Sequence, residues 1–140
     1  MSYSYLKLLI KIHMGSINKK ILIVEDEALM LRSLSDKFRE EKFTVLEAND
    51  GANGLDSALA NHPDIILLDI IMPKMDGLTV LEKLRQDEWG KEVPVIILTN
   101  LSDSDKVAEA MKNRAYDFLV KADWKLEDIV RKVNEKLAKD

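Results

Sequence analysis

Residues 65–77 read IILLDIIMPKMDG: an aliphatic run leads into Asp69, and two more aliphatic residues precede a proline-containing turn and Gly77. A short, continuous aliphatic run is typical of a strand that is covered on both faces, as in a parallel sheet. Burying an ionised carboxylate is costly, so an acid at the end of such a run needs an explanation. We interpret Asp69 either as an ordinary solvated strand end or as the functional group that this strand carries.

The same pattern recurs along the chain after residue 19, and each aliphatic run is followed by a segment with the apolar spacing of a helix. The five runs are Ile21–Val24, Phe43–Leu46, Ile65–Leu68, Val93–Leu98 and Tyr116–Val120. Strands that alternate with helices in this way predict a parallel sheet with right-handed crossovers. The predicted fold class is therefore α/β, with a doubly wound five-stranded parallel sheet and five helices.

The composition restricts the classes of function. The chain has 140 residues, no cysteine and a formal net charge of -4. This length suits one domain, and the lack of cysteine excludes disulfides, thiolate metal sites and thiol nucleophiles. A cytoplasmic location is expected on the same ground. The negative charge argues against direct binding of nucleic acid, and no apolar run reaches the roughly 18–20 residues of a membrane span.

Residues 1–17 differ from the rest because they contain lysines and no acid. Their apolar residues fit both the alternation of a strand and one face of a helix. Lys7 and Lys11 interrupt the apolar stretch, which makes it a poor secretory signal. We interpret residues 1–17 as an N-terminal extension of unknown role, which is either a dispensable arm, a start-site artefact ahead of Met14, or a packing element. Residues 18–140 are the predicted domain.

Polar groups stand where the predicted strands end. Glu25 and Asp26 follow the first strand, Asp69 ends the third, Thr99 ends the fourth, and Lys121 follows the fifth. In open α/β sheets, ligands bind beyond the carboxyl ends of the strands, at the topological switch point. Each residue alone has an ordinary structural explanation, so the prediction depends on their joint placement at one edge of the sheet.

The chemistry of this set favours phosphoryl transfer. Neighbouring carboxylates raise one another's pKa values, and a divalent cation removes that cost. Oxygen ligands without histidine or cysteine favour Mg²⁺, which often shares its site with phosphate. An ammonium and a hydroxyl on the other side would bind the remaining phosphoryl oxygens. We interpret the set as a site where a carboxylate acts as the nucleophile and becomes an aspartyl phosphate.

In this order, the residues resemble a response-regulator receiver domain of two-component signalling, similar to the chemotaxis regulators. The resemblance extends from about Lys19 to Lys139 and is carried by ILIVEDEA, ANDGANGLDSAL, PDIILLDIIMPKMDGLTVL, VPVIILTN and YDFLVKA. It implies the flavodoxin-like strand order 2-1-3-4-5. It also implies a stand-alone domain that receives a phosphoryl group from a histidine kinase or a histidine phosphotransfer protein and signals through protein contacts.

The resemblance implies a role for each site residue. Asp69 would be the phosphoacceptor, and Lys121 would bridge to the phosphoryl group. Mg²⁺ would be bound by Asp26 and Asp69 directly, by Glu25 mainly through water, and by the backbone carbonyl of Ile71. The expected enzymatic activity is limited to Mg²⁺-dependent self-phosphorylation and slow self-dephosphorylation of Asp69.

The resemblance also implies a conformational switch. Thr99 would swing its hydroxyl onto the phosphoryl group, and Phe118 would turn into the space that Thr99 leaves. Packing alone would also place Phe118 in the core. The expected readout face comprises about residues 102–139, where a downstream protein or a second copy in a homodimer would bind.

Four residues depart from the family pattern. Ala122 stands where a proline is usual, often after a cis peptide, so we expect a trans peptide after Lys121. Asn100 replaces a residue that is usually small. Ile71 and Leu101 are aliphatic at two positions where polar side chains help to place the attacking water. We therefore expect a long-lived phosphoryl group.

The alternative function is a phosphorylation-independent interaction or dimerisation module with the same fold. Two further families fit less well. A haloacid-dehalogenase-type phosphatase would need a second acid two residues after the nucleophile, where this chain has Ile71. A flavodoxin would need a hydroxyl-rich phosphate loop after the first strand, where Glu25 and Asp26 would repel the phosphate.

Overall fold

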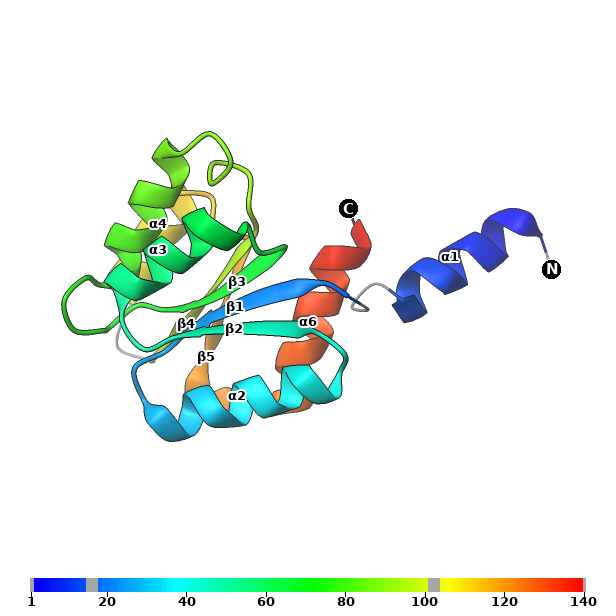
Figure 1. The fold of residues 1–140 in the computed structure, drawn as a ribbon, viewed down its shortest axis with the longest axis horizontal. Coiled ribbons are helices and arrows are strands. Elements are labelled where there is room, and N and C mark those ends of the chain that lie inside the picture. The colour runs from blue at the N-terminus through cyan, green and yellow to red at the C-terminus, as the bar shows by residue number, and fades with distance from the viewer. Residues whose placement is uncertain (1, 15–17, 101–103, 140) are drawn as a thin grey trace.

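The computed structural model describes residues 2–14, 18–100 and 104–139, and for residues 8 and 10–14 the description covers the backbone only. Five parallel strands form one sheet in the order β2-β1-β3-β4-β5, with helices on both faces (Figure 1). This confirms the predicted fold class and strand order.

The bounds of the elements follow the aliphatic runs closely. The strands are β1 (Lys20–Val24), β2 (Thr44–Ala48), β3 (Ile65–Asp69), β4 (Val95–Thr99) and β5 (Asp117–Val120). The helices are α1 (Tyr3–Met14), α2 (Ala28–Glu40), α3 (Gly51–Asn61), α4 (Gly77–Gln86), α5 (Ser104–Lys112) and α6 (Leu126–Lys139), with a short 3₁₀ turn, η1 (Lys121–Asp123). The five predicted helices are α2 to α6. The sixth, α1, was not among them and lies in the extension that the sequence left open between strand and helix.

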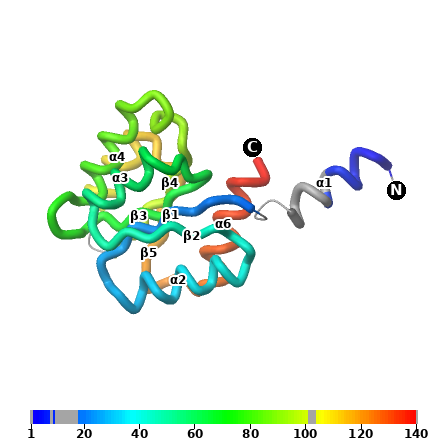
Figure 2. Tube along the Cα trace, in the orientation of Figure 1, coloured from blue at the N-terminus to red at the C-terminus, as the bar shows by residue number. Residues whose placement is uncertain are grey.

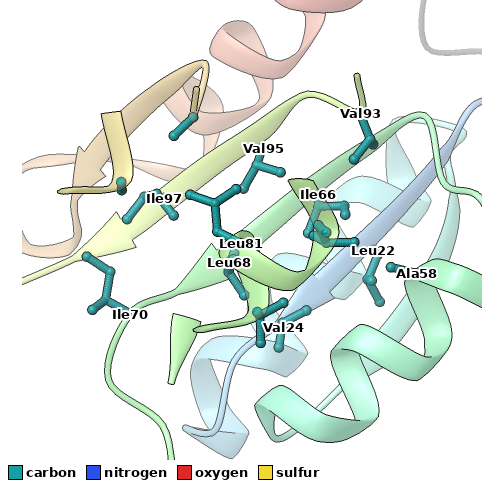
Figure 3. Packing of buried hydrophobic residues seen from close by; sticks show 14 of the residues in the cluster. Leu22, Val24, Ala58, Ile66, Leu68, Ile70, Leu81, Val93, Val95 and Ile97 are labelled. Atoms are coloured by element: carbon teal, nitrogen blue, oxygen red, sulfur yellow. The ribbon is translucent and has the colours of Figure 1, made fainter. Parts of the chain in front are cut away.

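Successive strand residues point to opposite faces of the sheet and build two hydrophobic clusters. Leu22, Ile66 and Ile97 pack on the face covered by α3, α4 and α5 (Figure 3). Ile23 and Leu67 pack on the opposite face, against α2 and α6. The central strands β1, β3 and β4 are buried on both faces, which explains why they appear in the sequence as unbroken aliphatic runs rather than as alternating patterns.

The connection from β3 to α4 is held close to the end of β3. The backbone N–H of Gly77 donates a hydrogen bond to the Ile70 carbonyl oxygen at 2.7 Å. A Cβ atom at position 77 would overlap the carbonyl oxygen of Asp69, so only glycine permits this approach. Asp76 then begins α4, because its side chain accepts a hydrogen bond from the Thr79 N–H at 2.9 Å. This close return fixes the backbone around Asp69.

Helix α1 lies outside the helices that cover the sheet, near α6 and the end at which the strands begin (Figures 1 and 2). Tyr3 and Tyr5 on this helix are exposed to solvent. Within the described parts of the chain, every helix is too short or too polar to cross a bilayer.

Candidate functional site

The carboxyl ends of β1 and β3 place two acids side by side. Val24 of β1 is in register with Leu68 of β3, so the next residues, Glu25 directly after β1 and Asp69 at the end of β3, lie side by side. Both carboxylates are buried, whereas Asp26 is exposed at the mouth of the site. One carboxylate oxygen from each of these three residues lies within 4.8 Å of the other two. The structure therefore brings together the acids that the sequence placed at the strand ends.

Lys121 approaches the same acids from the carboxyl end of β5, the edge strand of the sheet. Its Nζ atom lies 2.6 Å from Oε1 of Glu25 and 3.2 Å from Oδ2 of Asp69. Lys121 is the first residue of η1, directly after β5. Among the residues that the structure describes there is no cis peptide bond, so the bond to Ala122 is trans, as expected. The absence of a proline at this position does not keep the ammonium away from Asp69.

Burial and charge perturb both partners of this ion pair. Burial, together with the charge of Glu25, raises the pKa of Asp69 to about 7, although Lys121 opposes the shift. Burial disfavours the charged form of Lys121, but the hydrogen bond that its ammonium donates to Glu25 and the charge of Asp69 outweigh it and raise the pKa of the ammonium. One lysine thus fails to neutralise two buried carboxylates, and the site carries an excess of negative charge.

This donor set fits a divalent cation. The three clustered carboxylates offer hard oxygen ligands, and burial together with the charge of Glu25 disfavours the ionised form of Asp69 and raises its pKa. Mg²⁺ accepts oxygen ligands of this kind and keeps several waters, which the exposed position of Asp26 permits. The residues that could hold the cation are Glu25, Asp26 and Asp69, with the backbone carbonyl of Ile71 as a further donor on the same loop.

Thr99 and Phe118 line one cavity at the ends of β4 and β5. The Thr99 side chain is buried at the end of β4, and its hydroxyl donates to the Asn100 carbonyl oxygen at 3.1 Å. A cavity of about 170 Å³ is lined by Thr99, Phe118, Val120 and residues of α5. The two residues for which a switch role is predicted thus line the same cavity, together with Val107 of α5.

The expectation that Phe118 belongs to the core is wrong for this conformation. Phe118 is 40% exposed. The physical reason is its place on β5, which is an edge strand. Leu119 points into the cluster under α2 and α6, so Phe118 points to the opposite face, where α5 covers the edge only in part.

The aliphatic and amide residues around the site are placed as follows. Ile71 is 45% exposed and follows the acid cluster on the β3–α4 loop. Asn100 is exposed just beyond β4. Leu101, which the sequence also singled out, lies outside the described residues.

Sequence reasoning missed one residue of the site. Glu27 contacts Lys121, with Oε1 at 3.3 Å from Nζ. The lysine therefore has three carboxylate partners rather than two. The sequence did signal this residue through the continuous acidic triplet at residues 25–27. Only the packing of β5 at the sheet edge shows that the third acid, Glu27, pairs with Lys121.

The comparisons with known proteins agree with this geometry. A family model described as the response regulator receiver domain matches residues 21–134. Response regulator PleD of Caulobacter vibrioides is 39% identical over 102 residues, which are 73% of this chain and 22% of PleD. The chain therefore spans about a fifth of the length of that curated relative.

Solved structures share the fold over most of the chain. The receiver domain of Francisella response regulator 1452 has 30% sequence identity and a TM-score of 0.77, covering 87% of this chain and 98% of that one. A chain of the CheX–CheY–BeF3–Mg²⁺ complex from Borrelia burgdorferi has 29% identity and a TM-score of 0.75, covering 84% of this chain and 87% of that one. Because the family model covers most of the chain and these structures have its fold, the chain belongs to the response regulator receiver domain family.

Proposed function

We propose that this receiver domain accepts a phosphoryl group on Asp69 and that the reaction depends on Mg²⁺. The observation that carries the proposal is the buried Asp69 carboxylate at the end of β3, beside two further carboxylates and the ammonium of Lys121. The strand that carries this carboxylate holds it at the carboxyl-terminal edge of the sheet, and one positive group, the Lys121 ammonium, is already 3.2 Å away.

The proposed transfer needs Asp69 in its ionised form. One oxygen of Asp69 attacks the phosphorus of the donor, and the bond from phosphorus to the donor breaks, with its electron pair leaving on the donor nitrogen or oxygen. Glu25, Asp26 and the Ile71 carbonyl would share the cation with Asp69. When bound, Mg²⁺ supplies positive charge that favours the ionised carboxylate and the phosphoryl oxygens. Lys121 lies 3.2 Å from the Asp69 carboxylate and would neutralise one of the phosphoryl oxygens.

The proposed response to phosphorylation uses Thr99 and Phe118. A phosphoryl group on Asp69 would draw the Thr99 hydroxyl towards it, and the exposed Phe118 ring would move into the cavity that both residues line. The conversion of an exposed ring to a buried one changes the surface of β5 and α5. In this proposal α5, β5 and α6 form the readout face for a downstream protein or a second copy of the chain.

The proposed partners follow from the family. The phosphoryl donor is a histidine kinase or a histidine phosphotransfer protein, and the domain acts in the cytoplasm. The Borrelia burgdorferi relative, described as a CheX–CheY complex with BeF3 and Mg²⁺, supports a Mg²⁺ site and a protein partner here.

We further propose that residues 18–140 form the receiver domain and that residues 1–17 are a separate extension. Helix α1 lies outside the helices that cover the sheet, near α6, and the family match begins at residue 21. A chain that begins at Met14 should therefore fold with unchanged stability and be phosphorylated at the same rate.

The direct test is phosphorylation by acetyl phosphate in the presence of Mg²⁺, followed by intact mass measurement. The wild-type chain should gain one phosphoryl group, and the gain should be absent with Asp69→Asn or when a chelator removes Mg²⁺. Asp56→Asn is a matched control, because Asp56 is exposed on α3, away from the acid cluster. If the wild type gains nothing while its Mg²⁺ binding is also absent, the phosphorylation-independent interaction module replaces this proposal.

A further inference from the structure

We propose that Glu27 is a specificity-determining residue that holds Lys121 at the mouth of the site and disfavours doubly charged phosphodonors. This inference rests on the proposed phosphorylation of Asp69 and adds a residue to which no role in the transfer has been assigned above.

Three carboxylates share the ammonium of Lys121, and they are not equivalent. The distances from Nζ are 2.6 Å to Glu25, 3.2 Å to Asp69 and 3.3 Å to Glu27. The side chain of Glu27 is 65% exposed, whereas those of Glu25 and Asp69 are buried. Glu27 is therefore the solvent-side partner of the lysine, and it adds an exposed negative charge beside the acid cluster.

The local structure leaves the Glu27 carboxylate available for this contact. Glu27 stands at the N-cap position of α2, but its side chain makes no capping hydrogen bond. Its backbone N–H instead donates to Oε2 of Glu25 at 3.1 Å, which ties the loop to the acid cluster. The backbone of Glu27 thus has a structural role, while its carboxylate is directed to a residue 94 positions away.

A bound cation would increase the importance of this contact. The charges of Glu25, Asp26 and Asp69 would then be shared with the metal, and their attraction for Lys121 would weaken. Glu27 is outside that ligand set and would keep its full charge. It would restrain the lysine on the solvent side and leave one negative charge beside the path of the incoming donor.

Two small phosphodonors of different net charge distinguish an effect of Glu27 on donor preference from an effect on the phosphorylation rate in general. Acetyl phosphate arrives as a dianion; the oxygen of Asp69 displaces acetate, which leaves with the electron pair of the broken P–O bond. Phosphoramidate arrives with a protonated nitrogen and a smaller net charge; the same attack displaces ammonia. A negative charge at the mouth slows the first donor more than the second, so removing it should change the preference between them.

The experiment compares the rate constants for both donors in saturating Mg²⁺ and low salt. Glu27→Gln should increase the ratio of the acetyl phosphate rate to the phosphoramidate rate by about threefold or more, and raising the salt should reduce that gain. Glu27→Asp keeps the charge and should keep the wild-type ratio. The matched control is Glu127→Gln, because Glu127 is 73% exposed and lies 3.9 Å from a different lysine, Lys37. The control should leave the ratio unchanged.

The outcomes distinguish this inference from the function on which it rests. A wild type that both donors leave unphosphorylated overturns the proposed function and this inference with it. A phosphorylated wild type whose donor ratio is unchanged in Glu27→Gln overturns only the role of Glu27. An equal change in both rates in Glu27→Gln would also overturn this role, because Glu27 would then act on the site as a whole. A tenfold loss of Mg²⁺ affinity in that variant would overturn it too, because Glu27 would then act on the metal.

Discussion

The Nζ atom of Lys121 lies 3.2 Å from Oδ2 of Asp69, although the two residues are 52 positions apart in the chain. This ion pair lies among buried carboxylates, so its removal affects chemistry as well as packing. Lys121→Met leaves Glu25 and Asp69 without their positive partner and should raise the pKa of Asp69 further.

For Lys121→Met we therefore expect phosphorylation by acetyl phosphate at pH 7 to be slower by about tenfold or more, with the pH–rate profile moved to higher pH. Lys121→Arg keeps the charge and should lose less. The exposed Lys125 provides a control, since Lys125→Met should react as the wild type does. An unchanged rate with Lys121→Met would show that this lysine does not act in the transfer.

The raised pKa of Asp69 predicts how stability depends on pH. A carboxyl whose pKa is higher in the folded state than in the unfolded state favours folding below its unfolded pKa of about 4 and loses that contribution as the pH rises to about 7. Without Mg²⁺, Asp69→Asn should therefore be more stable than the wild type by about 2–4 kcal/mol at pH 8 and by much less at pH 4.

Urea unfolding with a chelator present, at a series of pH values, measures this difference. Mg²⁺ should reduce the difference in unfolding free energy at pH 8, because a cation that binds only the folded wild type stabilises the wild type by mass action. If the difference in unfolding free energy between Asp69→Asn and the wild type does not change with pH, the pKa of Asp69 is not raised in the folded state.

Asp26 is the exposed member of the acid cluster, which separates its proposed metal binding from folding. Asp26→Asn should leave the free energy of unfolding without metal within about 0.5 kcal/mol of the wild type, as for other surface positions. It should lower the Mg²⁺ affinity at least tenfold, measured as the loss of the rise in melting temperature with Mg²⁺ concentration. Asp56→Asn serves as the control, and equal Mg²⁺ stabilisation of Asp26→Asn and the wild type would exclude Asp26 as a ligand.

Gly77 lies against the backbone of Asp69, and this leaves no room for a methyl group. Gly77→Ala should lose about 2 kcal/mol or more in urea unfolding, because the β3–α4 loop must move away from the strand. Asp76→Ala is the informative comparison. It removes only the N-cap of α4 and should lose about 1 kcal/mol. If Gly77→Ala is no less stable than Asp76→Ala, the close approach of the two backbones is relieved at little cost.

The aliphatic side chain of Ile71 predicts a long phosphoryl lifetime, since it offers no hydrogen bond to an attacking water. Ile71→Asn should shorten the lifetime several-fold, measured as the decay of the phosphorylated mass after the donor is removed. Ile71→Val is the matched control and should decay as the wild type does. Leu101→Glu is a second variant that the sequence alone suggests. A lifetime that neither polar variant shortens would refute the idea.

The fold was largely predictable from the pattern of residues. Parallel strands under two layers of helices must be apolar on both faces, so each central strand appears in the sequence as a short aliphatic run. The bounds of the strands were less predictable where an apolar residue packs in the core without belonging to a strand. Phe43 was placed in a strand, but it precedes β2 and packs edge-to-face on Phe38 of α2, with ring centroids 5.0 Å apart.

Which groups meet at the candidate site also followed from the sequence, for a topological reason. The carboxyl ends of parallel strands lie along one edge of the sheet, so residues that end or follow strands converge whatever the length of the intervening helices. Glu25, Asp26, Asp69 and Lys121 needed no further information to be placed together.

Only the tertiary structure decided how these groups pair and which way the neighbouring side chains point. The third partner of Lys121, Glu27, depends on the exact return of β5, and the exposed ring of Phe118 depends on how much of an edge strand α5 covers. Local sequence determines whether a segment forms a strand or a helix and which residues stand at its ends, because backbone conformation depends mainly on neighbouring residues. Distances between side chains and their burial are properties of how distant segments pack, and they exist only once the whole domain is assembled.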